Sequence, residues 1–158
     1  MIETTSDELR AALGVERWVA EVQVAGPFES LQQLVEVAHK AATPLSESEI
    51  DEAVSHHPRI GERPVGDGTS QAFSRTEQAS ADADDVQLAD AIAAGNAAYE
   101  ARFGRVFIIR AAGRSRAEIY TELTRRLDNR GDIELAIVGE QLRDIAMLRL
   151  ETLYGDQS

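Results

Sequence analysis

Residues 132–153 read DIELAIVGEQLRDIAMLRLETL, a stretch in which apolar residues recur at steps of three and four. That spacing is typical of a helix with one face against a core, so the sequence predicts a helix over residues 132–153. Arg149 falls inside the apolar stripe. Because an unpaired buried charge is costly, we expect Arg149 to bind either a protein carboxylate such as Glu77 or an anionic ligand. The other members of the stripe are Leu135, Val138, Leu142, Ile145 and Leu153.

Signals for helix starts recur along the rest of the chain. Three pairs of a hydroxyl residue and a glutamate have the spacing of a capping box, in which each side chain bonds the other residue's backbone amide. These pairs are Thr5 with Glu8, Ser46 with Glu49, and Ser115 with Glu118. Besides the last helix, we expect helices at residues 6–13, 15–25, 30–42, 47–56, 70–80, 84–102 and 116–128.

Two irregular stretches interrupt the helical pattern. Residues 57–69 contain two prolines and three glycines, which favour an ordered loop. Val106-Phe107-Ile108-Ile109 is prone to β-structure, but no second strand is predicted for it to pair with. We therefore expect a buried extended connector near residues 105–112, with a short sheet as the alternative. The prediction is an all-α fold of about eight helices in a single domain, residues 1–158.

Composition excludes several classes of function. A net charge of −12 argues against a nucleic-acid partner and against an anionic membrane surface. No apolar run approaches the length of a membrane span. The absence of cysteine excludes disulfides and thiolate chemistry and fits a reducing compartment. Neither a secretory signal nor a peroxisomal tail is seen, so we expect a cytoplasmic protein.

His57 is the first candidate for chemistry. It immediately precedes Pro58, whose ring disfavours helical geometry at the residue before it, so the imidazole is fixed at a corner of the chain. Imidazole suits proton transfer near neutral pH. The alternative is that the histidine only complements the dipole at the end of a helix. His56 and His39 have no partner in the pattern, and we interpret both as structural.

A second candidate is the segment Phe73-Ser74-Arg75-Thr76-Glu77-Gln78. Ser74, Glu77 and Gln78 share one face of the predicted helix through their spacing of three and four. Such a face could hold a polar heterocycle, or it could be an ordinary solvated surface. The histidines lack the spacing of metal ligands, so no metal site is predicted.

Several motifs occur in order over nearly the whole chain. They are His57-Pro58, Ser74-Arg75-Thr76-Glu77-Gln78, Asn96-Ala97-Ala98-Tyr99-Glu100-Ala101-Arg102-Phe103-Gly104, Val106-Phe107-Ile108 and Leu148-Arg149-Leu150. In this combination the chain resembles the OHCU decarboxylases, which act on 2-oxo-4-hydroxy-4-carboxy-5-ureidoimidazoline in urate breakdown. The resemblance implies an all-α homodimer that converts this small molecule to (S)-allantoin without a cofactor. Ile60-Gly61-Glu62 after the HP unit looks like the bacterial branch of the family.

The resemblance also implies roles for individual residues. His57 corresponds to the family's proton donor and Glu77 to its acidic partner. Substrate-binding roles carry over to three parts of the chain and to the arginine of the closing LRL motif. These residues are Pro58; Ser74, Arg75, Thr76 and Gln78; Phe107, Ile108, Ile109, Arg110 and Ala111; and Arg149.

Two other functions stay open at this point. A sister decarboxylase acting on another ureido or hydroxy acid would use the same residues. A non-enzymatic helical interaction module would instead use the acidic N-terminal part of the chain, and would leave His57 and Glu77 apart.

Overall fold

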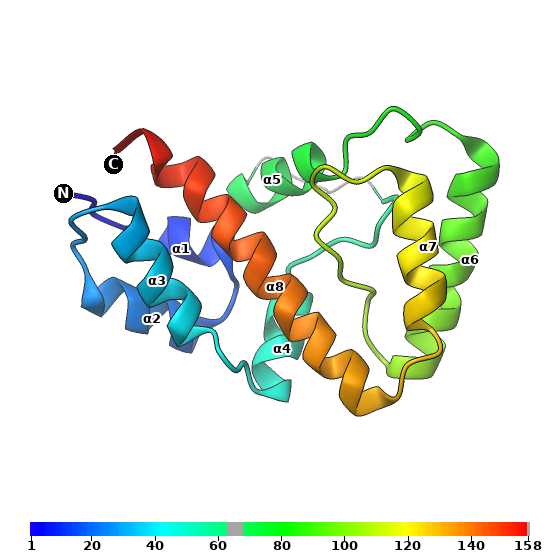
Figure 1. The fold of residues 1–158 in the computed structure, drawn as a ribbon, viewed down its shortest axis with the longest axis horizontal. Coiled ribbons are helices and arrows are strands. Elements are labelled where there is room, and N and C mark those ends of the chain that lie inside the picture. Colours follow the sequence, from blue (N-terminus) through cyan, green and yellow to red (C-terminus); the bar gives the residue numbers. More distant parts are fainter. Residues whose placement is uncertain (63–67, 158) are drawn as a thin grey trace. The chain divides into compact units, whose positions relative to one another are not determined.

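The computed structural model describes residues 1–62 and 68–157, and within these ranges the chain forms eight α-helices (Figure 1). Each lies within a few residues of a predicted helix, so the predicted all-α fold is confirmed. Residues 63–67 of the predicted loop lie outside the described residues. The helices are α1 (Ser6–Ala12), α2 (Glu16–Ala25), α3 (Leu31–Ala41), α4 (Glu47–Val54), α5 (Thr69–Glu77), α6 (Val86–Phe103), α7 (Arg116–Arg126) and α8 (Gly131–Tyr154).

Side-chain caps explain where several helices begin. Ser46 and Ser115 form complete capping boxes with Glu49 and Glu118, as predicted. Thr5 accepts a hydrogen bond from the Glu8 backbone amide, but the Glu8 carboxylate bonds the Thr5 hydroxyl rather than its amide. The third predicted pair is therefore a simple N-cap.

The chain divides into two compact units, each of which is described by itself. Unit 1 comprises Met1–His56 and Gly139–Ser158, and unit 2 comprises His57–Val138. The prediction that residues 1–158 form a single domain stays a prediction.

Unit 1 is built around α1, α2, α3 and the second part of α8. Trp18 of α2 is fully buried, and its Nε1 donates to the carbonyl of Ala38 in α3 at 2.9 Å. An isolated antiparallel bridge between Ile2 and Phe28, which the sequence did not predict, ties the N-terminal segment to the chain beyond α2. Because both residues are buried, this bridge closes one end of the unit-1 core.

Unit 2 is organised by α6 and α7, which pack side by side (Figure 1). Gly95 of α6 permits this close contact, since a Cβ atom there would lie only 2.6 Å from a methyl carbon of Leu123 in α7. After α6 the chain turns at Gly104, whose φ of 75° is the left-handed geometry of a helix C-cap. It then runs back along the two helices before entering α7 (Figure 1).

The segment between α6 and α7 is the extended connector that the sequence predicts. Residues 106–111 have no regular secondary structure, and Phe107, Ile108 and Ile109 are almost fully buried. The connector supplies part of the unit-2 core in place of a strand. That core comprises Ile60, Ile92, Tyr99, Phe107, Ile109, Ala111, Ile119 and Leu123.

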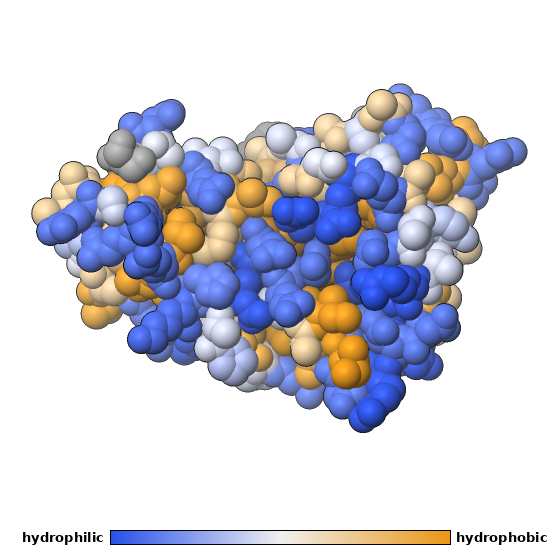
Figure 2. Space-filling model, viewed as in Figure 1, coloured by the Kyte–Doolittle hydropathy of each residue, from blue (hydrophilic) through white to orange (hydrophobic). Residues whose placement is uncertain are grey.

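Hydrophilic residues cover most of the face shown in Figure 2, and the hydrophobic residues on that face lie in separate small patches. This distribution agrees with the strongly negative net charge. Within the described ranges, no helix combines the length and the apolar character needed to cross a bilayer.

Candidate active site

His57 begins unit 2 and follows α4 after a short turn. Its side chain and that of Pro58 are half-buried, which places the imidazole at the corner of the chain that the sequence predicts. The position is suited to a group that must stay accessible to a small molecule yet be held in one orientation.

The loop after His57 is anchored at three successive residues. Arg59 forms a bidentate ion pair with Glu100 of α6, with nitrogen–oxygen distances from 2.7 to 3.1 Å. The carbonyl of Ile60 accepts a hydrogen bond from Nδ2 of the buried Asn96 at 3.0 Å. The amide of Gly61 donates to Oε1 of Gln78 at 2.9 Å. The loop that carries His57 is therefore fixed to both α6 and the end of α5.

The ion pair of Arg59 changes the ionisation of both partners. The hydrogen bonds from Arg59 lower the pKa of Glu100, and those to Glu100 and Glu62 raise the pKa of Arg59. Both groups are therefore charged at neutral pH. Because the Arg59 side chain is 46% exposed, we expect the pair to direct the loop more than to stabilise the fold.

Helix α5 presents its predicted polar face on its less exposed side. Ser74 is buried, Glu77 and Gln78 are half-buried, and Arg75 and Thr76 are exposed. Gln78 follows the last residue of α5 as its C-cap, two residues before the predicted end of the helix. The burial pattern confirms that Ser74, Glu77 and Gln78 share a face. A contact between Glu77 and His57 stays a prediction.

Gln78 has a structural partner that the sequence did not reveal. Its side-chain oxygen accepts from Gly61, and its backbone carbonyl accepts from the Arg116 guanidinium at 3.2 Å. The acceptor of its carboxamide is thus used to hold the His57 loop. A substrate-binding role for Gln78 would use its amide donors instead.

The extended connector is held on both sides of Ile109. Before it, the carbonyl of Ile108 accepts from the Arg126 guanidinium at 2.7 Å. After it, the Arg110 carbonyl accepts from Arg114 Nε at 2.9 Å, and the Ala111 carbonyl accepts from the Arg114 amide at 3.0 Å. The sequence predicts substrate contacts for Phe107 to Ala111, and these bonds show which carbonyl groups of that stretch are already engaged.

A buried ion pair lies beside the connector. The Arg126 side chain and the Glu134 side chain are each only 1% exposed, and their closest nitrogen–oxygen distance is 2.5 Å. Glu134 also accepts hydrogen bonds from the Tyr99 hydroxyl and, at 3.1 Å, from Asn129 Nδ2. Burial and the bond to Glu134 raise the pKa of Tyr99, so this hydroxyl stays protonated and donates.

Arg149 lies in unit 1, where it is 2% exposed as predicted. Its Nη1 donates to the carbonyl of Ala11 at 2.8 Å. The sequence analysis did not predict a backbone carbonyl as a partner of Arg149. It predicted either a carboxylate such as Glu77 or an anionic ligand. Both of those stay predictions.

His56 belongs to unit 1 and packs against Gly14, where a Cβ atom would lie 2.3 Å from the imidazole. This contact agrees with a structural role for His56. Among the described residues, no three His, Cys, Asp or Glu side chains gather so that they could hold a metal ion.

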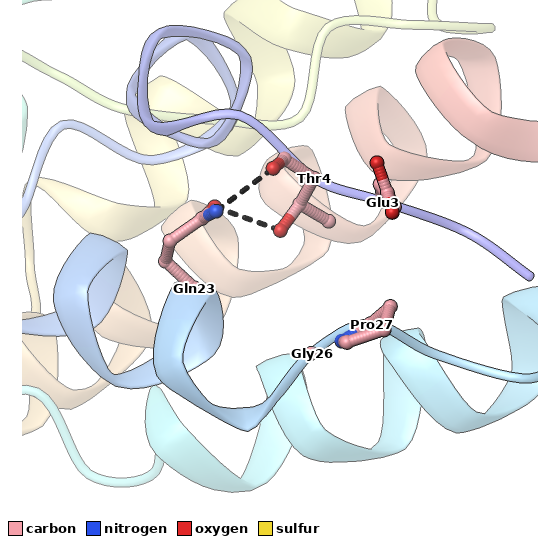
Figure 3. Close-up of a pocket in the computed structure, with 5 residues that line it drawn as sticks. All are labelled: Glu3, Thr4, Gln23, Gly26 and Pro27. Atoms are coloured by element: carbon pink, nitrogen blue, oxygen red, sulfur yellow. Dashed lines mark hydrogen bonds between the residues drawn. The ribbon is translucent and has the colours of Figure 1, made fainter.

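Two surface hollows avoid the predicted site residues. One, of about 180 Å³ in unit 1, is lined by Glu3, Thr4, Gln23, Gly26 and Pro27, and Figure 3 shows Gln23 bonded to both the hydroxyl and the carbonyl of Thr4. The other, of about 290 Å³ in unit 2, lies between residues 59–62 and one face of α6. In the first hollow Thr4 and Gln23 bond each other, and the Arg59–Glu100 pair borders the second.

The family model for OHCU decarboxylase matches residues 2–151. The chain belongs to the OHCU decarboxylase family. The resemblance carried by the ordered motifs is thereby confirmed, and with it the expected helical architecture.

Individual relatives agree with membership of the OHCU decarboxylase family. The chain is 31% identical over 134 residues to the mouse 2-oxo-4-hydroxy-4-carboxy-5-ureidoimidazoline decarboxylase, covering 84% of the chain and 75% of the mouse protein. It is 29% identical over 160 residues to the uric acid degradation bifunctional protein TTL of Arabidopsis thaliana. That match covers 99% of the chain but 49% of the plant protein, so the chain spans about half the length of this relative.

A solved structure gives the same fold. The crystal structure of an OHCU decarboxylase in the presence of (S)-allantoin superposes with a TM-score of 0.80 at 28% identity, covering 95% of this chain and 99% of that one. The helical fold of the described residues is therefore that of the OHCU decarboxylase family.

Sequence reasoning missed the buried group of Tyr99, Arg126 and Glu134 in this OHCU decarboxylase family member. One signal was present: Arg126 lies three residues after Leu123 and seven after Ile119, on the apolar face of α7. A charge on an apolar stripe is the same signal that identified Arg149.

Proposed function

We propose that the chain decarboxylates 2-oxo-4-hydroxy-4-carboxy-5-ureidoimidazoline to (S)-allantoin in urate degradation. The observation that carries this proposal is the family match over residues 2–151, which takes in both units and every predicted site residue. The mouse relative is named for this decarboxylation, and the plant relative is named for uric acid degradation.

The substrate's own structure removes the need for a cofactor. The carbon that bears the carboxylate also bears a hydroxyl, and its neighbour belongs to a C=N bond. When carbon dioxide leaves, the electron pair of the broken bond is accepted through that C=N bond. The nitrogen of that bond takes up a proton, the hydroxyl loses its proton as it becomes a carbonyl, and the neighbouring carbon takes a proton. Pyridoxal phosphate or thiamine diphosphate serves decarboxylations that lack such an internal acceptor.

In this scheme the protein must orient the carboxylate and deliver one proton to one face of a carbon. We assign the proton transfer to His57 and the orientation of its imidazole to Glu77. The corner position of His57, the three anchors of its loop and the half-buried side chain of Glu77 support this assignment. Ser74, Gln78 and the connector would bind ureido and ring groups, and Arg149 would counter the substrate's negative charge or fix Glu77.

The experiment uses the unstable substrate, generated in place from urate by urate oxidase and the hydrolase that acts next. Optical rotation of the product is followed with and without the protein. We expect the protein to give optically active (S)-allantoin faster than the spontaneous reaction. Slow racemic product, unchanged by added protein, would rule the proposed function out.

Three further properties belong to the proposal. We propose that residues 1–158 act as a single domain, that the chain forms a homodimer as the family resemblance implies, and that it works in the cytoplasm. The family match across both units supports the first, and the lack of cysteine fits the third. Light scattering coupled to size-exclusion chromatography tests the second, because a mass near 17.2 kDa would mean a monomer.

A further inference from the structure

Arg126 makes two kinds of contact from one buried guanidinium. Two of its nitrogens bind the Glu134 carboxylate, at distances from 2.5 to 3.2 Å. The third donates to the Ile108 carbonyl at 2.7 Å. The guanidinium carbon also lies 4.5 Å from the centre of the Phe107 ring. One side chain thus holds two consecutive residues of the connector.

This arrangement is not explained by stability alone. Burying an ion pair removes two charges from water, and apolar residues of similar size are often as stabilising. What the pair provides here is geometry, because a guanidinium is a rigid fork that can bond a carboxylate with one edge and a carbonyl with another. Glu134 fixes the fork, and Tyr99 and Asn129 fix Glu134. The one hydrogen bond of Arg126 that leaves this group goes to the connector.

The bond from Arg126 to the Ile108 carbonyl lies in the part of the connector whose backbone is expected to contact the substrate. The carbonyls of Ile108, Arg110 and Ala111 are engaged by arginine groups, as described above. Among the described residues, the backbone of Ile109 takes part in no hydrogen bond, and the residue as a whole is only 4% exposed and packs in the unit-2 core. The anchored carbonyls therefore surround one residue whose amide and carbonyl are not committed within the protein.

We propose that Arg126 is a positioning residue, which fixes Phe107 and Ile108 so that the backbone of Ile109 is set for ligand contact. Glu134 acts with it by holding the guanidinium in place. The ligand part of this inference rests on the proposed function, since it takes the connector as part of the substrate site. The anchoring of the connector by Arg126 does not.

The test compares Arg126→Lys with Tyr99→Phe. A lysine keeps a positive charge beside Glu134, but it cannot bond Glu134 and the Ile108 carbonyl with the geometry of the fork. Tyr99→Phe also removes a hydrogen bond to Glu134, but it keeps the ring that lies edge-on to Phe107 and leaves Arg126 intact. Tyr99→Phe is therefore the control, because it removes a hydrogen bond within the buried group but keeps the bond from Arg126 to the connector.

Two readouts are measured below the unfolding temperature of all variants. In the ligand-free protein, we expect amide hydrogen exchange over residues 107–111 to be about tenfold faster in Arg126→Lys than in Tyr99→Phe, since the lost bond is to a charged group. With (S)-allantoin as the probe, we expect the dissociation constant to rise about tenfold for Arg126→Lys and to stay near the wild-type value for Tyr99→Phe. The rise should appear in KM more than in kcat.

The outcomes separate the two proposals. Equal exchange rates and equal affinities in the two variants would overturn the positioning role of Arg126. Faster exchange over residues 107–111, with a wild-type protein that neither binds (S)-allantoin nor accelerates turnover, would support the anchoring and overturn the proposed function.

A second variant covers the case in which Arg126→Lys does not fold. Arg126→Met combined with Glu134→Gln leaves no unpaired buried charge and keeps an acceptor for Tyr99. We expect it to show the same faster exchange and the same loss of affinity. Wild-type exchange and affinity in this double variant would overturn the proposal.

Discussion

His57 follows the turn after α4 and precedes Pro58, and the three residues after this proline are each anchored. Those anchors go to Glu100, Asn96 and Gln78, and none depends on the imidazole. Because these three anchors are made by other residues, we expect the loop to keep its position when the His57 side chain is changed.

We expect His57→Asn to fold with a wild-type unfolding temperature and to lose a factor of about 10² to 10⁴ in turnover, the usual contribution of a general acid or base. The matched control is His56→Asn, because His56 is the neighbouring histidine and packs on Gly14. Formation of (S)-allantoin measures both. Comparable turnover in His57→Asn and wild type would remove His57 from the proposed mechanism.

Glu49 offers a test of electrostatics in unit 1. Its carboxylate accepts from Arg17 Nε at 2.7 Å and from the Ser46 amide at 2.9 Å. The Arg17 bond is the main cause that lowers the pKa of Glu49 from 4.5 to about 2. Because the folded pKa is the lower one, the stabilisation is complete above about pH 5 and is lost as the pH falls toward 2.

We expect Glu49→Gln to reduce the free energy of unfolding by about 0.5–1 kcal/mol at pH 7, since a glutamine keeps the capping bond but not the ion pair. Urea unfolding of both proteins from pH 7 to pH 2 measures the difference. The difference in the free energy of unfolding should shrink to nearly zero as the pH approaches 2. A difference that stays constant over this range would contradict the lowered pKa of Glu49.

At the residue scale, the sequence predicted those side chains that can be recognised from their immediate neighbours in the sequence. Arg149 was found because it interrupts an apolar stripe, and His57 because a proline follows it. Glu134 was not found, because its partners are Arg126, Asn129 and Tyr99. The bond to Tyr99 spans 35 residues, and no local pattern encodes it.

At the element scale, helix starts and stops were predictable because they depend on neighbouring residues. Ser46 and Ser115 cap their helices as the sequence indicates. The connector was also predictable, since a lone β-prone run without a partner strand had to be buried in another way. The anchors of the His57 loop were not, because Asn96 and Gln78 reach it from other elements.

Two helical glycines give a matched test of element packing. A Cβ atom on Gly95 would lie 2.6 Å from the fully buried Leu123, whereas one on Gly139 would lie 3.6 Å from Ile50, an ordinary contact. We expect Gly139→Ala to raise the free energy of unfolding by about 0.5–1 kcal/mol, because alanine has a higher helix propensity than glycine. The free energy of unfolding of Gly95→Ala should be at least about 1 kcal/mol lower than that of Gly139→Ala, because the side chain of Leu123 must move. Equal thermal stabilities in the two variants would show that α6 and α7 can separate without cost.

At the scale of the whole molecule, the dominant property is charge. The chain carries −12 at pH 7, and its isoelectric point is about 4.6. We expect solubility to be lowest and self-association strongest near pH 4.6, where mutual repulsion between molecules vanishes. Light scattering across pH 4 to 7 at fixed protein concentration measures this, and a flat profile would contradict it.

The division of the chain also has a consequence for the order in which the protein is made. Unit 2 is one continuous stretch, and all of it has been synthesised once Val138 has left the ribosome. Unit 1 is completed later, because two of its contacts join residues far apart in the sequence. Arg149 binds Ala11 across 138 residues, and Tyr154 binds Glu8 across 146 residues. Helix α1 is therefore translated well before the residues of α8 that bind it, and in that interval its unpaired apolar face is a site for chaperone binding.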